Sequence, residues 1–549
     1  MFAFLRRLGV ALSLAGLALA AWPASAWAAP TSLSREQARE LRDYGATLVL
    51  ARRGAGPALR RAGGVRLATS LRVWRLQSGA ALRVLPPLMR AGLVAQVEPD
   101  QPVDVANHLG QGDPLIGLEW WIASVGLDRA EPPGPGKPVT VIDTGTDLAH
   151  PEFAARPGTK PLNVQSTSAP NEEHGTAVAS VVGAPANGIG LVGVYPQASL
   201  QLWDASPSGS GITAGDVIQG LDAAIKNGPG VVNLSLGSQV RNPLLEAMVA
   251  ITFGSGTLVV AAAGNSRTGG SPAEYPASLP HVLTVGAIDQ SGQPAFFSSG
   301  SPYVDLAAPG MSIPVAASTT YHPPDYYDSF SGTSFASPIV AGSSAWVWTA
   351  RPTLDVTQLA AVMRASAQDI SSPGFDPFSG FGRLDIPTAL AVAAPAKDPQ
   401  EPNEDVNYLK PTGLLHRASV PLTRGSLSAR VEFAEDPRDV YRVWIPGRRT
   451  AIVSLRPSGG DVDLAMWGPR TISILEAGSA RRRDFRGISE RLGTKRELLR
   501  VRNTSKRGAY YYAEASVGVG SGTVVRKVSG IGYRLSVSIV KPKKKIVRR

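Results

Sequence analysis

The sequence predicts an α/β protein: a parallel β-sheet in a three-layer domain, preceded by a small α+β unit and followed by a β-sandwich. Between residues 104 and 395, short runs rich in Val, Leu and Ile alternate with runs typical of helices. Such alternation indicates a parallel sheet covered on both faces. After residue 405 the apolar residues recur at every second position, which is typical of a β-sandwich. The chain of 549 residues is too long for a single core.

Composition divides the chain into five expected segments. They are a signal peptide (1–29), a pro-segment or small domain (30–103), the α/β domain (104–395), the β-sandwich (396–540) and a basic tail (541–549).

The first segment has the features of a secretory signal peptide. Arg6 and Arg7 precede an apolar run at 8–21, and small residues follow, with two Ala-x-Ala sites that end at Ala26 and Ala28. An uncleaved N-terminal anchor is the alternative. We therefore expect an extracellular or periplasmic protein with no membrane span after removal of the signal, because no other apolar stretch is long enough to cross a bilayer.

Charge is distributed unevenly along the chain. Residues 1–103 carry a net charge of +9, residues 104–395 carry −13, and the residues from 397 onward carry +16. An acidic middle between two basic segments favours attraction within the molecule as much as binding to a polyanion, so a nucleic-acid partner is not expected. Cysteine is absent, which excludes disulfides and thiolate metal sites.

Residues 30–103 combine a helical start at 34–45 with strand-like runs at 71–77 and 92–100. The pattern alone fits an independent domain or a pro-segment. In the α/β domain, expected strands lie at 139–143, 198–204, 231–237, 257–265 and 281–289, and expected helices follow His174 or lie near 215–226 and 243–253. Ligand sites in such sheets lie at the carboxyl ends of the strands, where Asp143 and Asn265 occur.

Residues 391–405 are rich in Pro, Ala and acidic residues and are typical of a linker. Beyond them, apolar residues alternate with polar ones at 441–445 and 533–539, which predicts short strands with one buried face.

The segment 331–338, SGTSFASP, precedes the apolar run IVAGSSAWVW, which predicts a buried helix with Ser334 at its N-terminus. Unpaired backbone amides at a helix start favour negative charge beside them. Pro338 suits the first turn of that helix, and Gly332 allows close approach to the backbone. The simpler interpretation is that Ser334 only caps the helix.

Four residues together supply the parts of a nucleophilic site. A serine hydroxyl needs an imidazole to accept its proton and a carboxylate to hold the imidazole, roles for which His174 and Asp143 are candidates. The Ser334 amide and the Asn265 side chain are candidate donors to an oxyanion. The order Asp, His, Ser, without a GxSxG elbow, excludes the α/β-hydrolase arrangement.

These residues lie in segments that resemble the subtilisin-like serine proteases, the subtilase family: VIDTG, HGTAVAS, NLSLG, AAAGN and GTSFASP occur in the family's order. The resemblance implies a three-layer subtilisin-like domain with Asp143 as orienter, His174 as general base and then acid, Ser334 as nucleophile and Asn265 in the oxyanion hole. It also implies that the substrate backbone lies along 235–237, that is Ser235, Leu236 and Gly237. Ala177 departs from the second histidine that many members have.

The resemblance has further implications outside the chemical step. The resemblance implies that residues 30–103 are an inhibitory propeptide, because GLVAQVEPD resembles the last strand of the family's propeptides. Chemistry requires no cofactor, but a structural Ca²⁺ is possible: Glu152 and the loop with Asn187, Ile189 and Leu191 resemble the family's calcium site, with an unliganded surface turn as the alternative. EPNED, DPRDVYRVWI and GGDVDLAMWG resemble the bacterial pre-peptidase C-terminal domain.

We therefore expect a secreted serine endopeptidase, made as a zymogen, that acts on protein or peptide substrates. Its own propeptide is an expected partner, and we expect a monomer. The alternative is a catalytically silent relative that works as a binding module through its basic C-terminal domain. An intact Asp143, His174 and Ser334 set argues against that alternative.

Overall fold

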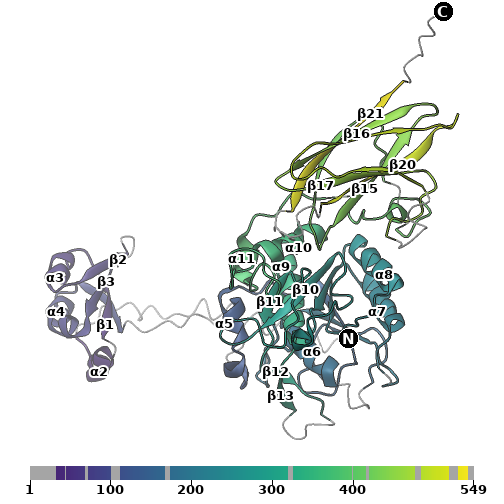
Figure 1. Cartoon of the computed structure of the whole chain (residues 1–549). Coiled ribbons are helices and arrows are strands. Elements are labelled where there is room, and N and C mark those ends of the chain that lie inside the picture. Colours follow the sequence, from purple (N-terminus) through teal and green to yellow (C-terminus); the bar gives the residue numbers. More distant parts are fainter. Residues whose placement is uncertain are drawn as a thin grey trace, which may run out of the picture. The chain divides into compact units, whose positions relative to one another are not determined.

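The computed structural model contains two compact units, residues 1–106 and residues 107–549, which are considered separately (Figure 1). The structure describes residues 32–43, 45–68, 72–99, 112–166, 173–209, 211–319, 326–398, 400–415, 419–475, 484–518 and 530–541. The expected signal peptide lies outside the described residues, and so does the basic tail beyond residue 541. Within the described part, no helix combines the length and apolar character needed to cross a bilayer.

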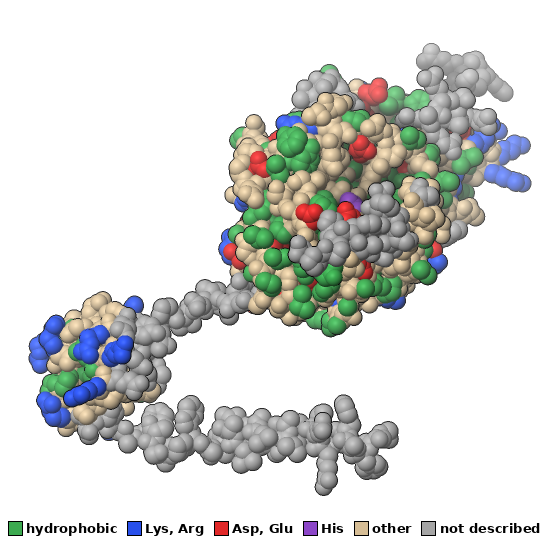
Figure 2. Space-filling model, turned by 90° about the horizontal axis from the view of Figure 1, so that it is seen from below, with side chains coloured by type: hydrophobic (Ala, Val, Ile, Leu, Met, Phe, Trp, Pro, Cys, Tyr) green, Lys and Arg blue, Asp and Glu red, His purple; other side chains and the backbone are tan. Residues whose placement is uncertain are grey.

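The first unit is a small α+β structure, as expected. Its four-stranded antiparallel sheet has the order β2-β3-β1-β4. The strands are β1 (Ala46–Ala51), β2 (Val65–Ala68), β3 (Val73–Gln77) and β4 (Val94–Pro99), and the helices are α2 (Arg35–Asp43), α3 (Gly56–Arg61) and α4 (Ser78–Arg90). Apolar side chains from the sheet, α3 and α4 form one core. Basic side chains gather on the face of this unit that Figure 2 shows.

The second unit is built around a seven-stranded parallel sheet with the order β11-β10-β9-β8-β5-β7-β6. The strands are β5 (Pro138–Asp143), β6 (Thr159–Pro161), β7 (Ser199–Asp204), β8 (Val231–Leu234), β9 (Leu258–Ala262), β10 (Val282–Ile288) and β11 (Leu306–Pro309). The five strands expected from the sequence are all present. Every residue of β8, β9, β10 and β11 is buried, as continuous apolar runs predict.

Helices cover both faces of this sheet and make three layers (Figure 1). On one face lie α6 (Glu173–Gly183) and α9 (Thr333–Ala350), and on the other lie α7 (Ala214–Asn227) and α8 (Pro243–Gly254). Successive residues of β5 divide between the two faces: Val141 joins the core with α6 and α9, whereas Ile142 joins the core with α7 and α8. The predicted α/β fold class is confirmed.

Smaller elements complete this domain. They are α5 (Trp121–Val125), α10 (Val356–Ala365), α11 (Ile386–Ala391), an antiparallel pair β12 (Ile313–Ala316) and β13 (Tyr327–Phe330), and single turns at Ile116–Leu118, Leu127–Arg129 and Arg267–Gly269.

The C-terminal part is a β-sandwich of two four-stranded antiparallel sheets, with the orders β14-β21-β16-β19 and β15-β20-β17-β18. The strands are β14 (Gly425–Val431), β15 (Arg438–Ile445), β16 (Thr450–Ser458), β17 (Val462–Trp467), β18 (Phe485–Ser489), β19 (Glu497–Arg502), β20 (Ala509–Val517) and β21 (Ile531–Val540). Alternate residues such as Tyr533, Leu535 and Val537 fill its core. The period-two pattern therefore predicted this sandwich correctly.

The segment expected to be a linker differs from that expectation in its second half. Asn403, Glu404 and Asp405 are buried, and a short turn, η5 (Val406–Tyr408), follows them. Acidic and proline-rich composition is typical of exposed linkers, but here the Asn403 carbonyl accepts a hydrogen bond from the Val440 amide in β15. Residues 401–405 therefore belong to the packed structure and not to a solvated connection.

Candidate active site

Asp143 is the last residue of β5, and His174 is the second residue of α6. The Nδ1 atom of His174 lies 2.7 Å from Oδ1 of Asp143, and the Thr144 amide donates to the same oxygen at 2.8 Å. Because the carboxylate only accepts, Nδ1 carries the proton and Nε2 is left as the acceptor. The pair thus has the tautomer that a general base requires.

Close packing of glycines brings β5 and α6 together. A Cβ atom on Gly175 would lie 2.0 Å from the carbonyl oxygen of Gly145, so the helix could not approach the strand end with any larger residue there. The Gly175 amide also donates to Oγ1 of Thr144 at 3.1 Å. These contacts fix the distance between the strand that carries Asp143 and the helix that carries His174.

The electrostatic environment favours protonation of His174. Burial lowers its pKa, but the charge of Asp143, the hydrogen bond to it and the charge of Glu173 outweigh burial, so the pKa is raised above 6.5. Asp143 therefore favours the protonated form of the His174 imidazole. The side chain remains 34% exposed, and its ring lies 5.7 Å from that of Phe335, measured between centroids.

Ser334 lies in the first turn of α9, but it is not the N-cap residue. Gly332 holds the N-cap position and Ser334 is the second helical residue, so the simple capping interpretation of Ser334 is wrong. The helix also begins earlier than expected, which makes Pro338 its sixth residue and not a first-turn residue.

Pro338 leaves the carbonyl of Ser334 without its usual hydrogen bond within the helix. Proline has no N–H group to donate to the carbonyl four residues earlier, which is that of Ser334. The hydroxyl of Ser235 donates to this carbonyl instead, at 2.7 Å. Asn233 in turn donates to the Ser235 hydroxyl at 3.0 Å and accepts from Ser337 at 2.7 Å. The backbone of Ser334 is thereby fixed to the end of β8.

Asn265, three residues after β9, is exposed at the same edge of the sheet. Its Oδ1 accepts from the amide of Thr333 at 2.9 Å and from the Thr333 hydroxyl at 3.0 Å. With the oxygen held in this way, Nδ2 is oriented toward Gly332, where an added Cβ would lie 3.4 Å from it. The side-chain amide is therefore a fixed donor next to the start of α9.

The three residues expected along the substrate continue the line of β8. Ser235 is buried, Leu236 is half-buried against the core on the α7 and α8 face, and Gly237 is exposed. The following residue, Ser238, forms an isolated antiparallel bridge with Tyr275. The exposed backbone of this segment lies next to Ser334, because the Ser334 hydroxyl donates to the Ser235 carbonyl at 3.4 Å.

The Ser334 and His174 side chains each have another hydrogen-bond partner. These two described side chains share no hydrogen bond, since the serine hydroxyl is directed to the Ser235 carbonyl. Catalytic hydrogen bonds are often long or poorly aligned without substrate and tighten when substrate binds.

The candidate calcium residues also come together. Oε1 of Glu152 accepts from the Leu191 amide at 3.0 Å, and Oδ1 of Asn187 accepts from the Ile189 amide at 2.9 Å. The sequence analysis missed Asp113, whose Oδ1 accepts from the amides of 187, 188 and 189. It also missed Glu119, which accepts from the Val192 amide at 3.0 Å.

Few hydrogen bonds offset the cost of burying the carboxylates of Asp113, Glu119 and Glu152. Burial, together with repulsion between neighbouring acids, raises the pKa of Glu119 to about 9 and that of Glu152 to about 7. Within the described residues, one buried oxygen of Asp113, of Glu119 and of Glu152 has no hydrogen-bond partner. Buried carboxylate oxygens of this kind suit a hard cation such as Ca²⁺.

Sequence reasoning also missed the residues whose hydrogen bonds fix the start of α9 around Ser334, namely Asn233, Thr333 and Ser337. Small polar residues in apolar segments give no distinct signal. The one available signal was Pro338, since a proline inside a helix leaves the carbonyl of Ser334 in need of another donor.

Comparison with known proteins gives a consistent result. The model of the Subtilase family matches residues 134–382. Subtilisin DY from Bacillus licheniformis is 35% identical over 254 residues, which cover 46% of this chain and 89% of that protein. Subtilisin E from Bacillus subtilis (strain 168) is 37% identical over 268 residues, or 47% of this chain, and the match spans only 66% of that relative's length. Among solved structures, fervidolysin from Fervidobacterium pennivorans has a TM-score of 0.47 at 18% identity, covering 83% of this chain and 85% of its own.

Proposed function

Since the chain belongs to the subtilase family, we propose that it is a serine endopeptidase that hydrolyses peptide bonds through an acyl-enzyme intermediate. The observation that supports this most is the 2.7 Å pair of Asp143 and His174 beside Ser334 at the start of α9. The pair supplies a base with the correct tautomer, and the helix start supplies a site for developing negative charge.

In the proposed first step, the Ser334 hydroxyl turns from the Ser235 carbonyl to Nε2 of His174. The hydroxyl oxygen attacks the peptide carbonyl carbon while His174 takes the proton, and Asp143 stabilises the resulting imidazolium. His174 then gives the proton to the leaving amine, which breaks the C–N bond. A water molecule, deprotonated by the same imidazole, hydrolyses the acyl-enzyme.

The tetrahedral oxyanion would receive two hydrogen bonds. One comes from the Ser334 amide, which at the second position of α9 has no partner within the helix. The other comes from Nδ2 of Asn265, which Thr333 orients by holding Oδ1. Both donors are fixed before substrate arrives, so little reorganisation is required during the reaction.

The substrate would lie in extended form along Ser235, Leu236 and Gly237. Gly237 is exposed and lacks a side chain, so the backbone of a peptide can approach this segment closely. The side chains that select the substrate residue are not identified by this arrangement, because the contact is made through backbone groups.

We further propose that the protein is secreted as a zymogen. The first unit has the compact α+β form expected of an inhibitory propeptide, and its basic face suits an acidic catalytic domain. A structural Ca²⁺ near Glu152, with Asp113 and Glu119 as added ligands, would stabilise the folded enzyme and take no part in the chemistry.

The test is the variant Ser334→Ala in the mature protein. Casein hydrolysis should fall by about 10⁶-fold in kcat, and labelling by a serine-directed phosphonate should disappear, because the nucleophile is absent. Circular dichroism should show an unchanged fold. Residual labelling at full stoichiometry would refute Ser334 as nucleophile. A folded parent enzyme that cleaves no unfolded protein would favour the silent binding module.

A further inference from the structure

The two sheets of the β-sandwich differ in what covers their outer faces. On the sheet β15-β20-β17-β18, outward side chains such as Val440, Trp467 and Tyr512 pack in a small apolar cluster with the segments that carry Val406 and Ile474. The outward residues of the sheet β14-β21-β16-β19 belong to none of the apolar clusters formed by the described residues. This second outer face is therefore the one that the described part of the chain leaves uncovered.

Strand register shows which residues share the uncovered face. Arg534 of β21 lies directly opposite Arg456 of β16 on one side and Ser428 of β14 on the other. Alternate residues of a strand point to the same face. We call this surface the arginine–serine face, and it consists of the even-numbered residues of 426–430, 450–458, 498–502 and 532–540. Most of these positions hold arginine or serine, and none holds an acidic or an aromatic residue.

Two arginines oppose each other between the inner strands of this sheet. Arg456 and Arg534 form a cross-strand pair, and both side chains are exposed. The Cβ atoms of such pairs lie about 4.5–5.5 Å apart, and like charges in this position destabilise a sheet. Among the described residues, neither guanidinium group has an acidic partner. An anion bound between them would relieve the repulsion.

Serine hydroxyls hold two guanidinium groups at this face. Nε and Nη2 of Arg534 donate to Oγ of Ser426 at 3.2 and 2.8 Å. Arg496, which directly precedes β19, donates from Nε to Oγ of Ser454 at 2.6 Å. A guanidinium group has five N–H donors, so each of these arginines keeps donors for another acceptor. Both groups are thus oriented before any partner binds.

The positive charge of the face is too extended for one small anion. Arg500 and Arg502 of β19 lie opposite Ile452 and Thr450, and Ile452 is four residues from Arg456 on β16. At about 3.4 Å per residue, four residues of a strand span about 14 Å. In the sequence, β21 is followed by KPKKKIVRR at 541–549, which also lacks acidic residues. A partner that fits this face therefore carries several negative charges along its length.

The chemistry of the face favours a polysaccharide over other polyanions. Single-stranded nucleic acids stack their bases on aromatic side chains, which this face lacks. Binding in a membrane interface requires exposed apolar side chains, but Ile452 and Val540 are half-buried and Leu498 is only 36% exposed. Serine hydroxyls donate and accept hydrogen bonds, as sugar hydroxyls do. Arginine forks match the planar geometry of carboxylates and also bind other oxyanions such as sulfate.

We propose that the arginine–serine face binds a linear polysaccharide that carries carboxylate or sulfate groups. Arg456 and Arg534 bind one acidic group of the polysaccharide, and Arg500 and Arg502 bind another further along its chain. The serines between them contact sugar hydroxyls. The β-sandwich thereby attaches the protein to an anionic polysaccharide, and this attachment does not depend on the proposed peptidase activity.

Binding is tested with the full chain that carries Ser334→Ala, so that autolysis cannot occur. Calorimetry uses polygalacturonate as the carboxylate probe, dextran sulfate as the sulfate probe and dextran as the uncharged control, which should not bind. Replacing Arg456, Arg500 and Arg534 together by Ser should weaken binding of at least one anionic probe by at least about 50-fold. The same change should reduce the slope of log Kd against log salt by about 2.

The matched control removes the same number of charges from exposed loops of the same sandwich. Replacing Arg491, Lys506 and Arg507 together by Ser should change Kd by less than about 3-fold. Equal losses in the two triple variants would reduce the effect to general charge attraction and overturn the proposal. So would loss of binding on deletion of 542–549 alone, or tighter binding of DNA or of phosphatidylglycerol vesicles than of both anionic probes. Circular dichroism checks that each variant is folded.

A stability measurement tests the role of the opposed arginines. Arg456→Ser alone should raise the Tm of the free protein by up to about 3 °C, because it removes the like-charge pair. The bound polysaccharide should raise the Tm of the parent more than that of this variant. A lower Tm for the free variant would assign Arg456 to the structure of the sheet and overturn its role in binding. Peptidase activity is absent from all of these proteins, so failure of this proposal and failure of the proposed function are separate outcomes.

Discussion

Among the described residues of the second unit, His174 and His281 each pair with a carboxylate, and the two histidines differ in their surroundings. At the sheet edge, His174 uses Nδ1 to contact Asp143, leaves Nε2 available and keeps 34% of its side chain exposed. At the domain junction, His281 uses Nε2 to contact Glu404, is only 3% exposed and stacks on Phe253 at 4.2 Å between ring centroids.

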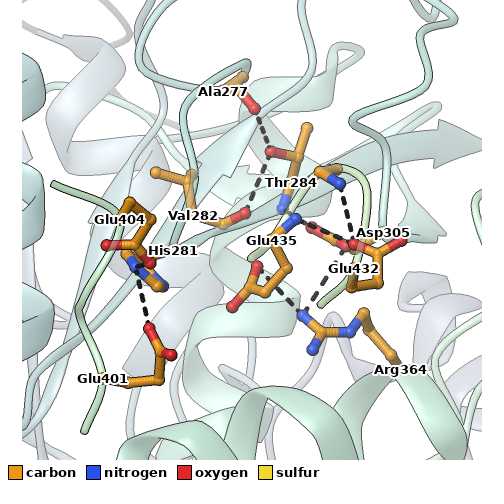
Figure 3. A network of polar contacts seen from close by, with 11 residues as sticks. Ala277, His281, Val282, Thr284, Asp305, Arg364, Glu401, Glu404, Glu432 and Glu435 are labelled. Carbon is orange, nitrogen blue, oxygen red and sulfur yellow. Dashed lines mark hydrogen bonds and ion pairs between the residues drawn. The ribbon is translucent and has the colours of Figure 1, made fainter. Parts of the chain in front are cut away.

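Both pairs raise the pKa of their histidine, although burial alone would lower it in each case. The chemical pair is therefore the same, and its role depends on what the rest of the ring meets. An imidazole that keeps one nitrogen available and part of its ring exposed, as His174 does, permits proton transfer. The His281 ring is almost completely buried and its Nε2 atom is paired with Glu404, an arrangement that suits a structural role at the junction (Figure 3).

The largest difference between the pairs should appear when each carboxylate is made neutral. Asp143→Asn should lower kcat by about 10⁴-fold, because the imidazole loses the partner that fixes its tautomer and stabilises its charge. Glu404→Gln should leave kcat unchanged and reduce only the stability of the domain junction. Steady-state kinetics on one peptide substrate checks both. A loss of kcat in Glu404→Gln as large as that in Asp143→Asn would remove the distinction.

The sequence predicted those elements whose structure is determined by residues adjacent in the chain. Strands β8, β9 and β10 are predominantly apolar, with Asn233 and Thr284 as their polar residues, and such runs are typical of buried strands. Asp143, His174 and Ser334 lie in short motifs that contain glycines. Helix α4 was missed, because its adjacent Pro86 and Pro87 are atypical of a helix interior.

The junction could not be predicted, because it is formed by residues far apart in the chain. His281 directly precedes β10, whereas Glu404 lies more than a hundred residues later in a stretch with linker composition. Nothing in either segment indicates the other. Contacts of this kind depend on how two folded domains pack. An acidic segment prefers solvent, but here residues 401–405 pack against β15 and are largely buried.

A second comparison concerns two asparagines: Asn265, which follows β9 in the catalytic domain, and Asn503 in the β-sandwich. Asn265→Ala should lower kcat by about 10²–10³-fold with little change in KM, because its amide acts on the oxyanion formed only in the transition state. Asn503 of the sandwich is buried and donates to the carbonyls of Ile445 and Arg507, both at 2.9 Å. Asn503→Ala should therefore lower the free energy of unfolding and leave kcat unchanged. Thermal denaturation and kinetics on both variants separate the two effects.

The smallest expected effect is a change in the pH dependence of kcat/KM, and it is specific to the pair of His174 and Asp143. The base must be neutral, so kcat/KM should rise with pH through the pKa of His174, which lies above 6.5. Glu173 contributes to that raised pKa by its charge, after the larger effects of burial and Asp143. Glu173→Gln should thus move the acidic limb to lower pH by less than about 1 unit, and added salt should shrink the difference between variant and parent. If the limb stays in place while kcat at high pH is unchanged, the group that titrates is not His174 in the environment described.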